Sequence, residues 1–144
     1  MFAPAAVHRN ASNAFVSTYR QIGVETGVSA ASPHKLVTML FDGFADAVRQ
    51  ARQAMERGQV EAKGKAIVRA VRIVDEGLLS SLDVTAGGKI ADDLMALYSY
   101  VTRRLTHANL RNDVTALDEC MHLMDTVRSA WLAIGPTTEG VKAQ

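Results

Sequence analysis

The amino-acid sequence predicts an all-α protein, an antiparallel up-down-up-down four-helix bundle that is preceded by a short N-terminal helix. Apolar residues recur every three or four positions through four long segments, which is the spacing of one buried helix face. Short turns separate these segments, so each helix is expected to run antiparallel to the one before it. No segment shows the strict alternation of polar and apolar residues that is typical of a strand.

The composition is that of a single globular domain. Of the 144 residues 48% are hydrophobic and 22% are charged, which is enough apolar sequence to bury a core. The formal net charge of +1 gives no reason to expect nucleic acid as a partner. No apolar run approaches the roughly 20 residues of a membrane span, so no membrane insertion is expected. The N-terminus lacks the pattern of a signal peptide and the single Cys120 suits a reducing compartment, so we expect a cytoplasmic protein.

The N-terminal part is predicted to hold an arm and one short amphipathic helix. Residues 1–13 are rich in Ala and Asn and show no period. Phe15, Tyr19 and Ile22 then recur at spacings of four and three, which fit one helix face. The predicted organisation is a flexible arm over 1–13, a helical-bundle domain over 14–135 and a loose tail over 136–144.

The first long helix is predicted from about Pro33 to Arg57. Ser32 suits the N-cap, Pro33 suits the first helical position, and Gly58 suits a left-handed stop. The first turns are apolar over more than one stripe, through Leu36, Val37, Met39, Leu40, Phe41 and Phe44. Such a helix is either central in a core or carries a second surface for a partner.

The second helix is predicted from about Val60 to Leu82. Its core stripe is close to a heptad and comprises Val60, Gly64, Ile67, Val71, Val74, Leu78 and Leu82. A parallel stripe of mostly small residues, Ala66, Ala70, Ile73 and Gly77, permits another helix to approach closely. The basic residues Lys63, Lys65, Arg69 and Arg72 are expected to form a solvated face.

Two further helices complete the predicted bundle. The third runs from about Lys89 to Ala108, with Ile90, Leu94, Leu97, Val101 and Leu105 in register and with Met95 and Tyr98 widening that face. The fourth runs from about Val114 to Ile134, where Gly135 and Pro136 end it. Its apolar stripe comprises Leu117, Met121, Met124 and Trp131, with Val127 and Ile134 beside it.

Candidate catalytic and metal-binding groups are few. A di-iron bundle needs two Glu-x-x-His pairs, and Glu119 with His122 makes only one, on what is expected to be a solvated face. His107 lies near a helix end, where the helix dipole favours an imidazolium, and no phosphoryl site surrounds it. Cys120 has no partner at metal spacing and is expected to be a small buried residue. The sequence therefore indicates neither an enzyme nor a cofactor.

Several separated segments match one known family in order and in spacing. They are Tyr19 with Val24; Ala31 to Gly43 (ASPHKLVTMLFDG); Ala70 to Leu82; Gly87 to Ala91 (GGKIA); Leu94 to Tyr100 (LMALYSY); Arg103 to Asn109 (RRLTHAN); and Ala130 with Trp131. Together they resemble the flagellin-specific export chaperones, the FliS family. The resemblance covers about Thr18 to Ile134.

The resemblance implies a protein that binds the C-terminal segment of flagellin in the bacterial cytosol, prevents premature polymerisation and assists export by the flagellar type III system. It implies no catalytic activity, and it makes an export-gate component a further expected partner. In this family the N-terminal segment and the flagellin tail are thought to use overlapping apolar surface. The partner-binding residues expected from the match and from helical spacing are Tyr19, Ile22, Leu36, Met39, Leu40, Leu94, Tyr98, Val101 and Leu105.

Two other interpretations stay open at this point. The chain would be a metal-binding or phosphorelay bundle if His107 or His122 served a reaction. It would be a structural oligomer if the surplus apolar faces were buried between identical subunits.

Overall fold

The computed structural model describes residues 31–143, and within them every side chain except those of residues 84–86 and 136–143. In this part of the chain there are four α-helices, α2 to α5, with a π-helical segment and a 3-10 turn between α3 and α4. The all-α prediction is thereby confirmed. The arm over 1–13 and the helix with Tyr19 and Ile22 lie outside the described residues, and the domain boundaries stay predictions.

Helix α2 spans Pro33–Glu56 and begins as the sequence predicts. The Ser32 side chain accepts a hydrogen bond from the backbone N–H of Lys35 at 3.1 Å, and Pro33 occupies the first turn, where no backbone donor is needed. The helix stops before Gly58, whose φ of 68° is the left-handed conformation that glycine adopts without strain.

Helix α3 spans Val60–Arg72 and continues into the π-helical segment Ile73–Leu78 and the 3-10 turn Leu79–Ser81. The sequence predicts one regular α-helix here, so this part of the prediction is wrong in geometry. A π-helical turn holds more residues than an α-helical turn, which rotates the side chains that follow it. Over so short a stretch the spacing of apolar residues does not distinguish the two geometries.

Helix α4 spans Val84–Arg111 and α5 spans Val114–Ala143, and each contains one glycine with non-helical backbone angles. Gly88, with φ 55° and ψ −131°, breaks α4 directly before Lys89, where the sequence predicts the helix to begin. Gly135, with φ 70°, ends the regular part of α5, and the backbone after it returns to a helical path. Both breaks use an angle that residues other than glycine rarely adopt.

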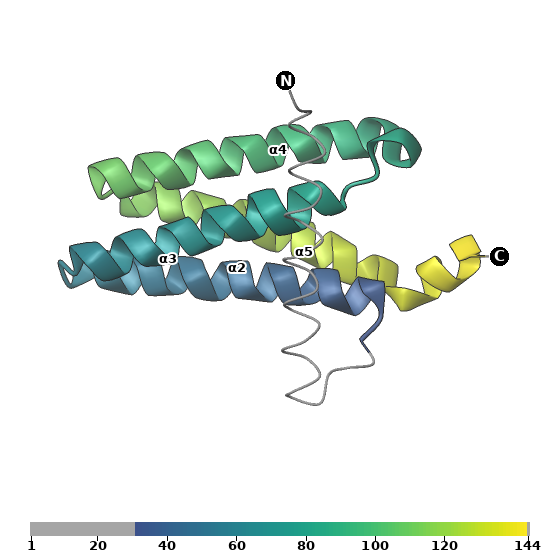
Figure 1. Cartoon of the computed structure of the whole chain (residues 1–144), viewed down its shortest axis with the longest axis horizontal. Coiled ribbons are helices and arrows are strands. Elements are labelled where there is room, and N and C mark those ends of the chain that lie inside the picture. Colours follow the sequence, from purple (N-terminus) through teal and green to yellow (C-terminus); the bar gives the residue numbers. More distant parts are fainter. Residues whose placement is uncertain (1–30, 144) are drawn as a thin grey trace, which may run out of the picture.

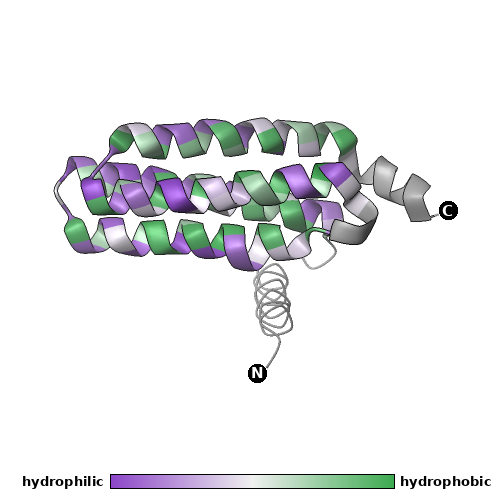
Figure 2. Cartoon of the chain, turned by 90° about the horizontal axis from the view of Figure 1, so that it is seen from above, coloured by the Kyte–Doolittle hydropathy of each residue, from purple (hydrophilic) through white to green (hydrophobic). Residues whose placement is uncertain are grey.

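The four helices form a closed ring of antiparallel neighbours (Figure 1). Helix α2 packs against α3 and α5, and α4 packs against the same two helices, whereas no Cα atoms of the diagonal pairs lie within 8 Å of each other in the described residues. Green apolar positions recur along every helix in Figure 2, as expected when each contributes one face to a shared core. The up-down-up-down arrangement follows from the short turns, as predicted.

Buried side chains change in size along the bundle. Toward the turns that join α2 to α3 and α4 to α5, many of them are alanines that pack beside Leu105 and Leu117, including Ala51, Ala54, Ala66, Ala108 and Ala116. Toward the opposite end they are larger, including Leu40, Phe41, Phe44, Leu78, Tyr98 and Met124. Because the separation of packed helices depends on the side chains at the contact, this gradient permits close approach at the first end and wider spacing at the second.

The predicted positions of Val60, Ile90 and Lys63 are wrong. Val60 and Ile90, which the sequence places on core stripes, are 70% and 72% exposed, since each lies in the first turn of a regular helix at an end of the bundle. Lys63, which the sequence places on a solvated basic face, is only 5% exposed.

The buried Lys63 side chain has a structural role. Its Nζ donates hydrogen bonds to the Asn109 backbone carbonyl at 2.9 Å and to Asn112 Oδ1 at 2.6 Å. Asn109 lies in the last turn of α4, whose carbonyls lack partners within the helix and whose dipole favours a cation. Periodicity does not reveal this contact, because the partners lie 46 and 49 residues away along the chain.

A pair of glycine substitutions tests the α2–α3 boundary. Gly64 lies inside α3 and an added Cβ would meet no atom within 4 Å, so Gly64→Ala is expected to raise the free energy of unfolding by about 0.5–1 kcal/mol. A Cβ added at Gly58 would also meet no atom within 4 Å, but the backbone there has a positive φ. Gly58→Ala is therefore expected to lower the free energy of unfolding by about 1–2 kcal/mol. Urea denaturation followed by circular dichroism measures both, and effects of equal sign would contradict the assignment of Gly58 as the helix stop.

Candidate functional site

An apolar pocket of about 340 Å³ opens at the end of the bundle where α2 begins and the regular part of α5 ends. It lies at the end with the larger core side chains, and helices α2, α4 and α5 line it together with the turns that follow α3. The lining residues are Val37, Phe41, Leu78, Ser81, Leu82, Ile90, Leu94, Tyr98, Thr126, Val127, Ala130, Trp131 and Ile134. None of these described lining residues carries a charge.

The apolar excess at the start of α2 is divided between core and pocket. Leu40 and Phe44 are 2% and 1% exposed and belong to the core. Val37 is half-buried and lines the pocket, and Phe41 serves both, since it is 3% exposed and forms part of the pocket wall. The second stripe of this helix therefore lines the pocket as well as extending the core.

Tyr98 forms an aromatic part of the pocket lining. Its side chain is 3% exposed, and this burial raises the pKa of the hydroxyl to about 12. The hydroxyl is therefore neutral at physiological pH. Its neighbour one turn earlier on α4, Leu94, lines the same pocket.

His34 and Trp131 join the start of α2 to the end of α5 beside the pocket. His34 Nε2 donates to the Trp131 backbone carbonyl at 2.8 Å, and the indole N–H of Trp131 donates to the His34 carbonyl at 3.1 Å. The two rings are stacked, with centroids 4.6 Å apart and planes at 10°. These reciprocal contacts, the His34–Trp131 clasp, hold the indole ring in the pocket wall.

Two ion pairs join the outer surfaces of the same helices. Arg128 Nε on α5 lies 2.8 Å from Asp42 Oδ1 on α2, and Arg52 Nε on α2 lies 2.8 Å from Asp118 Oδ1 on α5. All four side chains are partly exposed, so each pair adds little to stability. Their contribution is to the register of α5 on α2.

The structure brings together only part of the predicted partner-binding set. Leu94 and Tyr98 lie in the pocket lining. Leu40, Val101 and Leu105 are 2%, 0% and 0% exposed and lie in the core, where they present no surface in this arrangement of the helices.

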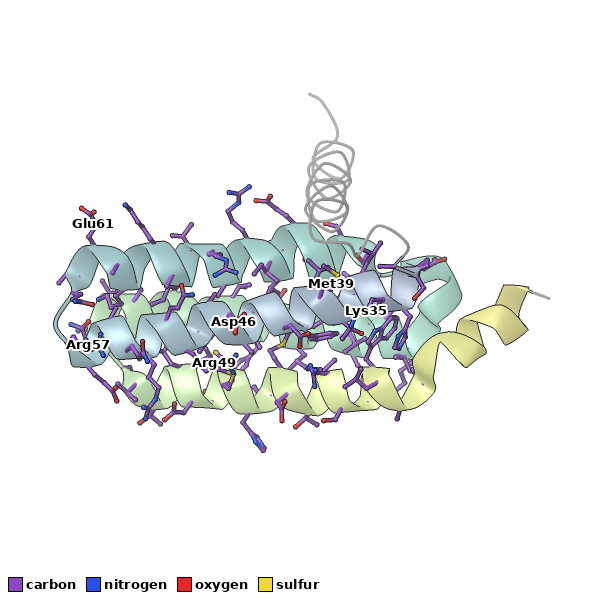
Figure 3. All side chains as sticks on the ribbon, turned by 90° about the horizontal axis from the view of Figure 1, so that it is seen from below. Lys35, Met39, Asp46, Arg49, Arg57 and Glu61 are labelled. Carbon is purple, nitrogen blue, oxygen red and sulfur yellow. The ribbon has the colours of Figure 1, made fainter. Side chains whose placement is uncertain are left out.

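Two other predicted residues on α2 lie outside the pocket lining. Leu36 is 7% exposed, and Met39 is half-buried. Met39 and Lys35 lie toward the end of the bundle where α2 begins, whereas Arg57 and Glu61 mark the opposite end (Figure 3). Tyr19 and Ile22 are outside the described residues.

Sequence reasoning missed most of the lining that comes from α5 and from the turns after α3. The sequence pattern identifies Val127, Trp131 and Ile134 as apolar positions of the fourth helix but does not place them in a partner site, whereas all three line the pocket. The pattern predicts Leu78 and Leu82 as part of the core stripe, and both also line the pocket. The fourth helix carries two adjoining apolar stripes, although one stripe is enough to bury a helix against a core. The second stripe is the sequence signal that could have indicated this part of the pocket.

The sequence predicts that Glu119 lies on a solvated face, but the structure places it in a half-buried network of hydrogen bonds. Its carboxylate accepts hydrogen bonds from the Tyr100 hydroxyl at 2.5 Å and from Arg104 Nε at 2.7 Å. These bonds, with that from Tyr100 the larger cause, lower the pKa of the Glu119 carboxyl below its ordinary value. His122, its partner in the Glu-x-x-His pair, is exposed. In the described part of the chain no group of three or more His, Cys, Asp or Glu side chains is placed to hold a metal ion.

The other two candidate groups, His107 and Cys120, each contact residues of the fold. His107 Nε2 lies 3.2 Å from Asp113 Oδ2 at the turn between α4 and α5. Cys120 is fully buried, as predicted, and its Sγ–H donates to the Val101 carbonyl at 3.6 Å. Burial raises the pKa of the Cys120 thiol to about 12, so the reactive thiolate is scarce at neutral pH.

Comparison with known proteins adds the identity of the family. The family described as Flagellar protein FliS matches residues 15–138. The chain belongs to the FliS family. The resemblance found in the separated sequence segments is thus confirmed, and the matched range includes every residue of the pocket lining.

Relatives in distant bacteria cover most of this FliS-family chain. It is similar to the flagellar secretion chaperone FliS of Salmonella typhimurium, with 46% identity over 121 residues that span 84% of this chain and 90% of the relative. The Escherichia coli K12 protein of the same name is 45% identical over 113 residues, or 78% and 83% of the two chains. The Bacillus subtilis FliS is 30% identical over 107 residues, or 74% and 78%.

The described helices also bear on membrane association. None of them combines the length and the apolar character that a membrane crossing requires.

Removal of the imidazole ring tests the His34–Trp131 clasp. His34→Ala deletes the hydrogen bond to the Trp131 carbonyl and the stacked ring, so the free energy of unfolding is expected to fall by about 1–2 kcal/mol. Trp131 is the single tryptophan of the chain, so a red shift of its fluorescence is expected as the ring becomes more exposed. His34→Gln retains an N–H donor and is expected to recover part of the loss. Unchanged emission and stability in His34→Ala would contradict a holding role.

Thiol labelling tests the surroundings of Cys120. A disulfide reagent at mildly alkaline pH is expected to react with the folded protein at least about a hundredfold more slowly than with the urea-unfolded chain, because burial suppresses both thiolate formation and access. Absorbance of the released thiol measures the two rates. Equal rates would show that the α4–α5 contact opens readily.

Proposed function

We propose that this FliS-family chain is a flagellar export chaperone that holds the C-terminal segment of flagellin in the apolar pocket. The observation that carries the proposal is an uncharged pocket of about 340 Å³ in a chain whose relatives are named flagellar secretion chaperones. A pocket of this size accepts the anchoring side chains of one helix face, with the rest of the segment lying over the neighbouring surface.

The proposed task has a physical basis. A subunit that is exported through a narrow channel must be unfolded, yet its terminal segment must be amphipathic enough to pack in the filament. When exposed, such a segment self-associates, and a pocket that accepts its apolar face prevents this. Because ordering the segment costs conformational entropy, the affinity per unit of buried area is limited, which favours release at the export system.

The segment that contains Tyr19 and Ile22 is proposed to cover the pocket before flagellin binds, as the family resemblance implies. The position of α2 supports this proposal. Val37, on the second turn of α2, already lines the pocket, so the chain that leads into Pro33 arrives at the same end of the bundle. Leu36 and Met39 lie on those first turns and are proposed to contribute to the surface around the pocket.

The proposal includes binding without catalysis, in the cytoplasm and without a cofactor, and an export-gate component as a second partner. Family membership supports each of these points. No specific observation favours a metal-binding or phosphorelay protein, since Tyr100 and Arg104 already engage the Glu119 carboxylate.

Two matched substitutions test the proposed binding surface. Ile90 is 72% exposed in the pocket lining, and Val68 is 55% exposed on α3 outside it. Because both side chains are largely solvated, Ile90→Asp and Val68→Asp are expected to leave folding intact. Ile90→Asp is expected to weaken binding of a synthetic flagellin C-terminal segment by at least about tenfold, since it removes an apolar contact and brings a charge to an uncharged pocket. Val68→Asp is expected to bind as the parent does.

Titration calorimetry of the full chain with that segment, taken from the flagellin of the same organism, measures these affinities. A negative heat-capacity change is expected because apolar surface is buried. Absence of binding by the unaltered chain would contradict the proposed function. Light scattering under the same conditions distinguishes a structural oligomer, in which a second copy of the chain would occupy the apolar surface.

A further inference from the structure

The hydrogen-bonding groups of the pocket are not equivalent. Two of its hydroxyls are already engaged within their own helical segments. Ser81 Oγ donates to the Gly77 carbonyl, and Thr126 Oγ1 donates to the His122 carbonyl at 3.0 Å. Donor hydrogens used in this way do not need a partner from a bound segment.

The Trp131 donor is also engaged, because its indole N–H bonds to the His34 carbonyl at 3.1 Å. Tyr98 differs from these groups. Its hydroxyl has no hydrogen-bond partner among the described residues, although the side chain is only 3% exposed. Of the side-chain donors that the structure describes in the lining, the Tyr98 hydroxyl is therefore the one that remains available.

The direction of the helix is expected to bring this hydroxyl toward the pocket, which Tyr98 lines. Side chains on an α-helix lean toward its N-terminus, so Tyr98 leans over the turn that carries Leu94 and toward Ile90. Both of these residues line the pocket. A hydroxyl in this position can bond to water while the pocket is open, but a segment that fills the pocket removes that water. A purely apolar guest would leave the hydroxyl buried and unsatisfied.

We propose that Tyr98 is the specificity-determining residue of the pocket, and that its hydroxyl forms a hydrogen bond with an uncharged polar side chain, an amide or a hydroxyl, within the apolar face of the bound helix. This inference rests on the proposed function, since it deepens what the pocket selects. The occupant is the flagellin segment proposed above. An uncharged group is required because the described lining holds no charged residue that would compensate a buried ion.

The chain offers a matched control for this hydroxyl. Tyr100 lies two residues farther along α4, outside the pocket lining, and its hydroxyl is bonded to Glu119 at 2.5 Å. Tyr98→Phe and Tyr100→Phe therefore each delete one phenolic hydroxyl. The first comes from the pocket and the second from a structural network. Tyr100→Phe is expected to lower stability and to leave binding unchanged, whereas Tyr98→Phe is expected to retain stability.

The test is calorimetric titration of the full-length chain and both variants with the synthetic flagellin C-terminal segment. Tyr98→Phe is expected to weaken binding about two- to tenfold, the effect of one neutral hydrogen bond. The polar uncharged residues on the apolar face of the peptide are then replaced one at a time by apolar residues of similar shape. One replacement is expected to weaken binding to the parent chain but to have little further effect on Tyr98→Phe, which identifies the hydrogen-bond partner.

Each outcome of this experiment decides a separate point. Equal or tighter binding by Tyr98→Phe would overturn the specificity role while leaving the proposed chaperone function intact. Additive effects of every peptide replacement would also overturn it, since no peptide group would then depend on the hydroxyl. If the unaltered chain did not bind the segment, the proposed function itself would fail, and the inference that rests on it would fail with it.

Discussion

The unequal size of the core side chains is the constraint on which the other features of this bundle depend. Alanines at one end permit the helices to approach closely, and there Lys63 reaches across to the last turn of α4. The buried aromatic side chains Phe41, Phe44 and Tyr98 lie toward the other end, where the bundle opens into the pocket.

An open apolar pocket requires walls that do not collapse onto each other. The His34–Trp131 clasp meets this requirement, because two hydrogen bonds and a stacked contact hold the indole ring in place. The ion pairs between α2 and α5 are exposed, so they add alignment and little energy. The pocket thus combines an apolar lining with a polar framework behind it, so its walls are already in place when an apolar helix face binds.

Local features of the chain were predictable from sequence because their causes are local. The Ser32 cap, the Gly58 stop and the break directly before Lys89 follow from backbone conformational preferences of a few adjacent residues. The π-helical segment Ile73–Leu78 was not predictable, since it preserves an apolar spacing close to that of an α-helix. The family resemblance, which rests on ordered segments and not on geometry, anticipated the membership that the comparison established.

By itself, the sequence determined that four amphipathic helices form an antiparallel bundle, and that α2 carries more apolar surface than one stripe. Only the tertiary structure decided which apolar residues are core and which line the pocket. Leu40, Val101 and Leu105 are covered, whereas Val37, Leu94 and Tyr98 meet at the open end. Periodicity records the face of a helix on which a residue lies. Exposure depends in addition on whether a neighbouring helix, set by its register and separation, covers that face at that level.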